Sequence, residues 1–402
     1  MASPFASKPG VSEGAVSWKS LPAVIESALL NTAIKLAPGG VHVQEHPEVW
    51  TQRLSRSKWG DRIPHLAKNA DGVERWVVDG REIPLAGVAD CGAAMPDRTV
   101  NPQCWADVPT SIYDPKERLK VMDRAGIDYA VLYPTVAGSG GQNFGRIEYA
   151  ELELACVQAY NDWLLEEWAS VSDRFIPQCI TPLFPVDTAV KEIRRAVKNG
   201  HRGVIYPSVP MELRDVPHIN DSIYDPLWAT CQELAVPICF HAGASSAIQI
   251  PAYEGYSPTI AAAFQAITRP ASTVSVLVNL LISKILMRFP HLKVVLAESG
   301  LGWGAYLLEY TDFQATGDQL PQNGYDLMGR AAFGFAEVKK TPERVSARAR
   351  PLGRLRRPDR DPTAPHGRSR QNHVVDRFSP HRYALAEVIG VGRRTIRRRA
   401  RG

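Results

Sequence analysis

Three side chains of this chain could bind or serve a metal ion. His42, His241 and Glu298 each follow a run of apolar, β-type residues. Two imidazoles that converge with a carboxylate form an open site, in which a divalent metal keeps a position for substrate. For one histidine alone, a hydrogen bond to a backbone carbonyl is the more ordinary explanation. Two histidines at strand ends favour a metal site with His42 and His241 as ligands.

Glu298 lies in VVLAESGLGW, where an apolar strand meets a glycine-rich turn. Beside a metal and its substrate, such a carboxylate serves as general acid or base, with its pKa tuned by partial burial. The alternative is that it caps the following helix, a role that Ser299 could fill instead. We interpret Glu298 as the catalytic residue.

The remaining polar and aromatic candidates receive no chemical role. Five other histidines close no strand, and three tryptophans are expected in the core or a pocket wall: His46, His65, His201, His218, His291, Trp163, Trp228 and Trp303. The six cysteines include no C-x-x-C pair, so neither a zinc knuckle nor a disulfide framework is indicated. Reduced, mostly buried thiols are expected.

Six apolar segments are predicted as strands that alternate with helical patterns. They cover 39–45, 128–135, 175–183, 203–208, 237–243 and 293–300. This alternation predicts βα units around a parallel sheet, either a (β/α)8 barrel or an open doubly wound sheet. No glycine-rich phosphate loop follows the first segment, and polar residues gather at the carboxyl ends of the strands. We therefore predict an α/β protein of the TIM-barrel type.

Local signals place the connecting elements. Helices are expected around Leu152–Trp163, around Val190–Val197 with Asp187 as its cap and Gly200 as its end, and from the cap residue Asp225 with Pro226 first in the helix. The segment WVVDGREIPLAG indicates a hairpin, inserted between the first two strands, that would cover the site. Residues 244–270 are rich in Pro and Gly and are predicted to form a second active-site loop.

The charge is unevenly distributed along the 402 residues. Residues 344–402 hold 17 Arg, no Lys and four acidic residues, a net charge of +13, which leaves residues 1–343 with a net charge of −8. An acidic globular part offers no broad attraction to nucleic acid. Because no long apolar run and no secretory leader stand in the chain, a cytoplasmic protein without membrane contact is expected.

Several blocks in this order resemble the amidohydrolase-related family, in the branch of aminocarboxymuconate-semialdehyde decarboxylase. They include PKERLKVMDRAGIDYAVLYPT, GHRGVIYPSVP, YDPLWATCQELAVPICFHAG and RFPHLKVVLAESGLGW, and the resemblance covers about residues 40–340. It implies a metal-dependent (β/α)8 barrel, with zinc or manganese, that decarboxylates or hydrolyses a small carboxylate. A homodimer is expected by this analogy alone.

The family's ligand pattern is only partly present. The resemblance places the first-strand histidine ligand at His42 and the fifth-strand ligand at His241, while Gly40 stands where the family has a first ligand and Glu298 replaces a catalytic histidine. The family's final ligand, an aspartate in a W-x-S-D-[FY]-P-H segment, has no counterpart. We therefore expect weak metal binding and impaired activity.

The Arg-rich end favours a shifted reading frame. Plausible codons for NHVVDRFSPHRYALAEV, read one base over, give TSWTDFPHIDTLWP, which restores the missing segment. The alternative is a basic arm that binds nucleic acid or an anionic membrane. We divide the chain into an N-terminal extension (1–35), an incomplete barrel (36–343) and an aberrant, disordered tail (344–402).

The sequence thus predicts a metal-dependent decarboxylase of a small aromatic or unsaturated carboxylate. Hydrolysis of a lactone, ester or amide in the same site is the alternative, and an inactive product with a nucleic-acid-binding tail is a third.

Overall fold

The computed structural model describes residues 41–85, 102–244 and 250–300, together with 303, 304, 306, 307 and 310. The N-terminal extension (1–35) and the Arg-rich tail (344–402) proposed from sequence lie outside the described residues, as do Gly40 and Cys91. In the described part no helix has the length and apolar character needed to cross a membrane.

A parallel sheet forms the centre of the molecule, with its six strands in the order in which the chain makes them. The strands are β1 (Val41–His42), β5 (Ala130–Tyr133), β6 (Phe175–Ile180), β7 (Gly203–Ile205), β8 (Ile238–His241) and β9 (Val294–Ala297). Every strand predicted from sequence is present. Sequential parallel pairing is the pattern of a (β/α) barrel, and the described part is six strands of one.

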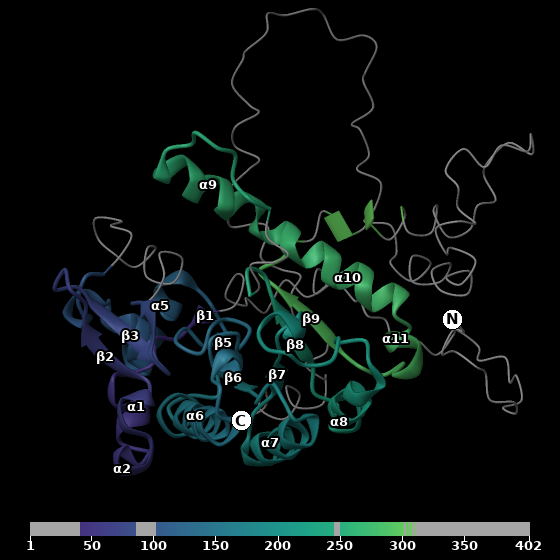
Figure 1. Ribbon diagram of the computed structural model, residues 1–402, viewed down its shortest axis with the longest axis horizontal. Helices are drawn as coiled ribbons and strands as arrows, with labels where there is room; N and C mark the ends of the chain where they lie inside the picture. The colour runs from purple at the N-terminus through teal and green to yellow at the C-terminus, as the bar shows by residue number, and fades with distance from the viewer. Residues whose placement is uncertain are drawn as a thin grey trace, which may run out of the picture.

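Helices follow the strands around the outside of the sheet (Figure 1). The longer ones are α5 (Pro115–Ala125), α6 (Ala150–Trp163, continued by a π-helical turn over Leu164–Ala169), α7 (Val186–Asn199), α8 (Asp225–Glu233), α9 (Pro258–Thr268) and α10 (Ser272–Ile282). Four-residue helices are α1 (Glu48–Thr51), α2 (Arg56–Trp59), α4 (Thr110–Tyr113) and α11 (Ile285–Arg288). Predictions of α6, α7 and α8 are confirmed as elements.

Two predicted helix caps are wrong by one or two residues. The residue before α7 is Pro185, so Asp187 lies inside the first turn. Its negative charge there still interacts favourably with the helix dipole. The residue before α8 is Tyr224, and Asp225 is itself the first helical residue. The predicted end of α7 at Gly200 is confirmed, with φ of 132° at that glycine.

The predicted hairpin is present as part of a small antiparallel sheet. β2 (His65–Lys68), β3 (Glu74–Val78) and β4 (Arg81–Pro84) pair in that order. Asp79 and Gly80 connect β3 to β4 with φ values of 49° and 77°, the left-handed pair that a tight hairpin needs. Trp76 of this sheet packs edge-on against Trp50 of α1. That the hairpin covers the mouth of the barrel stays a prediction.

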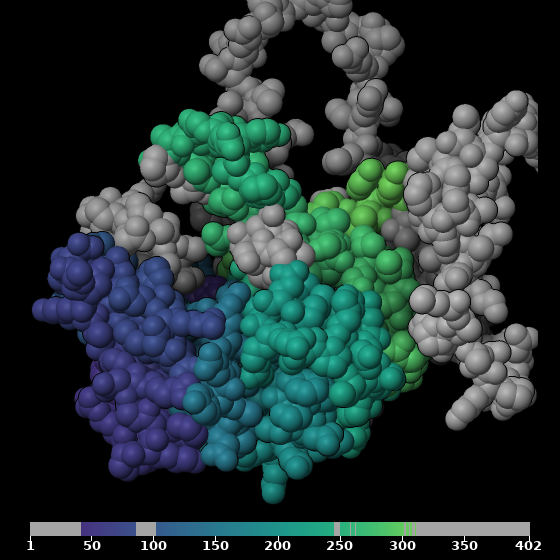
Figure 2. Space-filling model, in the orientation of Figure 1, coloured from purple at the N-terminus to yellow at the C-terminus, as the bar shows by residue number. Residues whose placement is uncertain are grey.

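The prediction of a loop over 244–270 is wrong for its second half. Residues 245–249 lie outside the described residues, but α9 occupies Pro258–Thr268. The side chain of Ser257 accepts a hydrogen bond from the Ile260 amide, and Pro258 takes the first helical position. This cap signal and the run of alanines favour a helix despite the surrounding glycine and proline. In the space-filling view α9 rises above the rest of the described molecule (Figure 2).

Apolar side chains fill the space on both sides of the sheet. Trp163 and Trp228, predicted as core residues, are fully buried. All five described cysteines are free thiols, and four of them are buried, which confirms the prediction for these residues.

Candidate metal centre

His42 is the last residue of β1 and points toward the centre of the strand ends. Its Nδ1 lies 3.0 Å from the carbonyl oxygen of Pro134, in the turn that follows β5. A carbonyl can only accept, so Nδ1 carries the proton of this hydrogen bond. The lone pair of the neutral ring is therefore on Nε2.

His241, the last residue of β8, has the same arrangement. Its Nδ1 lies 2.7 Å from the carbonyl oxygen of Ala242, so Nδ1 donates and Nε2 is left as the acceptor. The side chain is buried, and Nε2 has no hydrogen-bond partner among the described residues. The His42 and His241 rings meet edge to face, with 4.9 Å between their centroids. Two imidazoles from strands far apart in sequence thus converge.

Glu298 follows β9 directly and completes the cluster. Its Oε1 lies 3.5 Å from Nε2 of His42 and 3.6 Å from Nε2 of His241. The backbone at Glu298 has a φ of 55°, a left-handed conformation that non-glycine residues adopt rarely and that concentrates at functional sites. The carboxylate had no basic neighbour in the sequence, but the fold supplies two imidazoles.

The protonation of Glu298 follows from these neighbours. Burial alone would raise the pKa of its carboxyl group, but the polar contacts and charge of His241 and His42 outweigh burial and hold the pKa well below its ordinary value. Glu298 is therefore ionised at neutral pH. A negative charge this close to two imidazoles calls for positive charge between them, either a proton or a bound cation.

The three donor atoms fit a metal ion. Nε2 of His42, Nε2 of His241 and the Glu298 carboxylate lie within 4.8 Å of one another. Ligand atoms at about 2.0–2.1 Å from a tetrahedral zinc stand about 3.3 Å apart, close to both nitrogen–oxygen separations seen here. Nε2 of His241 has no hydrogen-bond partner among the described residues, and a neutral imidazole with a free lone pair is the form that binds metal. These residues therefore fit a divalent cation with one or more positions left open.

Tyr133 and Arg118 surround the cluster. The Tyr133 ring centroid lies 5.2 Å from that of His241 and 6.1 Å from that of His42. The guanidinium of Arg118 donates to the backbone carbonyls of His42, at 3.2 Å, and of Ser111. Neither residue was singled out from sequence, because each lies in a pattern typical of a strand or an amphipathic helix.

A separate cavity lies on the other side of β8. Adjacent strand residues point to opposite faces, so Phe240 faces the helices while His241 faces the cluster. A cavity of about 180 Å³ adjoins Phe240 and is lined by side chains from residues 208–219, by Trp228 of α8 and by residues of α10, among them Val276 and Leu280. None of His42, His241 and Glu298 lines this cavity.

The structure brings together all three residues singled out from sequence, His42, His241 and Glu298. Their roles as ligands and catalytic group stay predictions. Two of the histidines that were given no role form hydrogen bonds away from the cluster. His65 contacts the Ile63 carbonyl, and His201 contacts the Ala196 carbonyl.

Comparison with protein families gives one match, to the model described as Amidohydrolase, over residues 75–332. This range covers more than half of the chain and includes His241 and Glu298, whereas His42 precedes it. No match is found among curated proteins.

Solved structures of other proteins are similar to this chain. An amidohydrolase from Mycobacterium avium subsp. paratuberculosis K-10 is 20% identical, over 73% of this chain and 81% of its own, with a TM-score of 0.51. A 2,6-dihydroxybenzoate decarboxylase from Rhizobium is 23% identical, over 58% and 70%, with a TM-score of 0.42. A 5-carboxyvanillate decarboxylase from Novosphingobium aromaticivorans DSM 12444, with bound manganese, is 17% identical, over 73% and 74%, with a TM-score of 0.46. The first of these likenesses supports the barrel fold.

Proposed function

We propose, from the premise that this chain belongs to the amidohydrolase family, that it is a metal-dependent decarboxylase of small aromatic or unsaturated carboxylates. One observation carries the proposal: two imidazole nitrogens and a carboxylate from three strand ends converge within 4.8 Å. These ends are carboxyl ends of parallel strands, where barrel enzymes hold their reacting groups.

His42 and His241 would hold the cation through Nε2, because Nδ1 of each ring is engaged by a backbone carbonyl. Glu298 would supply the third donor atom, since Oε1 is nearly equidistant from the two nitrogens. A divalent ion bound there, zinc or manganese, would supply Lewis-acid chemistry to a substrate carboxylate and an adjacent oxygen. Decarboxylation then needs a proton at the ring or alkene carbon that loses carbon dioxide. Because Glu298 is ionised, it would first accept a proton, from a substrate hydroxyl or from water, and then deliver it to that carbon.

The two roles of Glu298 separate in one variant. In Glu298→Gln the side chain keeps its shape but loses its charge, so a donor role predicts weaker binding of zinc and manganese. A proton-transfer role alone predicts unchanged metal binding with loss of turnover. The geometry favours the donor role, and we expect metal affinity to fall at least tenfold, measured by titration with elemental analysis.

The activity test uses the full chain, stripped of metal and titrated with zinc or manganese. Because Gly40 stands where the family has a first ligand and the family's final aspartate has no counterpart, we expect weak binding and therefore use an excess of metal in the assay. Benzoates labelled with ¹³C in the carboxyl group and bearing a neighbouring hydroxyl would release labelled carbon dioxide. No metal-dependent release, with metal shown to be bound, would exclude decarboxylation of this class.

Hydrolysis of a lactone, ester or amide is the second candidate, favoured by the description of the matching family. The same centre would serve it, because a Lewis acid next to a carboxylate activates acyl groups as well. Metal-dependent acid release from a lactone panel, with no carbon dioxide from the benzoates, would favour hydrolysis.

A further inference from the structure

Glu45 is a buried carboxylate three residues after His42. Its side chain has no exposed surface, and both of its oxygens accept backbone hydrogen bonds. Oε1 accepts from the Thr135 amide at 3.2 Å, and Oε2 accepts from the Val136 amide at 2.9 Å. Burial raises the pKa of Glu45 to about 7, against the lowering effect of these hydrogen bonds. A carboxylate is costly at such a place, which suggests a function for it.

The turn that Glu45 holds is the one that orients His42. Pro134 directly precedes the two amides bound by Glu45, and its carbonyl accepts the hydrogen bond from Nδ1 of His42. A shift of this turn would move the carbonyl and release the ring. The orientation of Nε2 toward Glu298 therefore depends on the position of residues 134–136.

We propose that Glu45 is a positioning residue, which holds the Pro134–Val136 turn so that the Pro134 carbonyl fixes the His42 imidazole with Nε2 directed at the metal. This inference rests on the proposed metal centre for its purpose, though the contacts that carry it are independent of a metal. Outer groups that orient a histidine ligand commonly matter for metal affinity by about 10–100-fold.

Other contacts also support the turn and decide how the test is designed. Asn143 donates from its side chain to the Val136 carbonyl, and its own amide donates to Ala137. The turn should therefore keep its general course without Glu45, while the precise place of the Pro134 carbonyl is lost. The expected defect lies at His42 and not in the fold as a whole.

Glu153 provides a matched control. It is also fully buried, its pKa is also raised to about 7 by burial, and its Oε1 also accepts a backbone hydrogen bond, from Leu183. Its ionic partner is Arg214, 2.8 Å away, and neither contact leads to His42. Glu153→Gln thus removes a carboxylate at the same depth from a different place, together with its ion pair to Arg214.

The first measurement needs no metal. The Nδ1 proton of His42 should give a solvent-protected imidazole signal in ¹H–¹⁵N spectra, assigned by its loss in His42→Asn. We expect Glu45→Gln to lose that protection, because its amide group opposes one of the two backbone N–H donors. We expect Glu153→Gln to retain it.

The second measurement is the affinity for zinc and manganese, by titration of the full chain. Glu45→Gln should bind about 10–100-fold more weakly than the unchanged chain, whereas Glu153→Gln should stay within twofold. If Glu45→Gln fails to fold, Glu45→Asp replaces it. Its loss of metal affinity should lie between those expected for Glu153→Gln and Glu45→Gln, because the shorter side chain reaches only one amide.

Two results would overturn the inference: a protected His42 signal and normal metal affinity in the Glu45 variant, or an equal loss in the Glu153 control. If the unchanged chain binds no metal, the proposed function fails, but the imidazole signal still decides the role of Glu45.

Discussion

His201 and His241 are two buried histidines with the same local chemistry and different surroundings. They are 2% and 4% exposed. In each, Nδ1 contacts a backbone carbonyl, of Ala196 for His201 and of Ala242 for His241. In each, Nε2 lacks a hydrogen-bond partner among the described residues. The rings alone do not tell a metal ligand from a structural residue.

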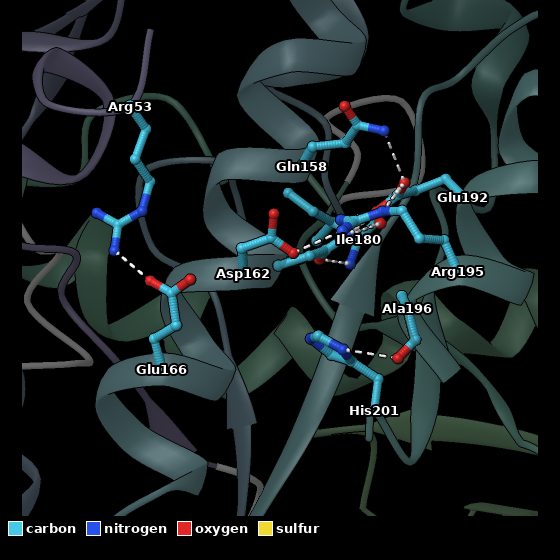
Figure 3. Close-up of polar contacts among 10 residues, drawn as sticks. Arg53, Gln158, Asp162, Glu166, Ile180, Glu192, Arg195, Ala196 and His201 are labelled. Carbon is cyan, nitrogen blue, oxygen red and sulfur yellow. Dashed lines mark hydrogen bonds and ion pairs between the residues drawn. The ribbon is translucent and has the colours of Figure 1, made fainter. Parts of the chain in front are cut away.

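The difference lies in what converges on Nε2. His201 precedes β7, at the amino end of the strands, beside a network in which Arg195 pairs with Glu192 and Asp162 (Figure 3). Burial, with a smaller effect from Arg195, lowers the pKa of His201 to about 4. His241 ends β8, at the carboxyl end, where His42 and Glu298 face it.

An unpartnered imidazole nitrogen is therefore not a metal site by itself. At the amino end, in the part of the chain that the structure describes, Glu192 and Asp162 are both paired with Arg195 and are therefore less available to share a cation with His201. At the carboxyl end, Glu298 faces two imidazoles. A second and third donor decide the chemistry.

The largest expected difference is in metal binding. His241→Asn should lower the affinity for zinc or manganese by more than about 100-fold, because it removes one of the three donors that the described residues bring together. His201→Asn should leave the affinity unchanged within twofold. Titration of both variants with either metal measures this, and equal losses in the two variants would contradict the distinction drawn between the two ends of the barrel.

The sequence was sufficient to separate these histidines because strand ends leave a clear signal. His241 closes an apolar run, and His201 stands before one, so the barrel topology alone places them at opposite ends. The same logic brought His42 and Glu298 to the mouth. It works because each βα unit is recognisable from its own residues and parallel pairing then follows.

What could not be predicted depends on distant contacts. Glu45 is the last residue of the first predicted strand and received no role there, and only the approach of the Thr135 and Val136 amides makes it a buried acceptor. A loop was predicted where the structure has α9, and the cause is local. Ser257 and Pro258 form a helix start, but the surrounding glycine and proline residues made the segment look like a loop. Hydrogen bonds from a distant turn, such as those to Glu45, left no signal in the sequence.

Acid should destabilise the protein through His201. Its pKa is about 4 when folded and 6.5 when free of the fold, so between these values the unfolded chain binds more protons. The free energy of unfolding therefore falls as the pH drops from 6.5 to 4, by about 3 kcal/mol in total from this residue. Above pH 6.5 His201 has no such effect.

His201→Gln isolates that contribution, because its amide can still donate to Ala196 but does not titrate. Urea unfolding at pH 7 and pH 4 should show a smaller loss for the variant than for the unchanged chain. The variant must be compared with the original chain, because Glu45 and Glu153 act in the opposite sense. Their pKa values are raised from 4.5 to about 7, so they lower the free energy of unfolding as the pH rises from 4.5 to 7. Parallel pH profiles would rule out a buried neutral His201.

The smallest expected effect on stability comes from the ion pair of Arg53 with Glu166, which is as short as the ion pairs of Arg195. Arg53 donates to Glu166 at 2.7 Å (Figure 3). The Glu166 side chain is 60% exposed, however, and a carboxylate oxygen of Glu167 lies 3.7 Å from the same guanidinium. Solvent screening and a substitute partner should limit the loss in Glu166→Gln to under about 1 kcal/mol, and added salt should reduce it further.

Glu192→Gln is the contrast for that pair. The Glu192 side chain is 1% exposed, and its two oxygens accept from Arg195 and Asn161. The Gln amide replaces one of these buried acceptors by an N–H donor and removes the negative charge opposite Arg195. A loss of about 3 kcal/mol is expected by urea unfolding, with little dependence on salt. Similar losses for the two variants would mean that burial does not set the strength of these contacts.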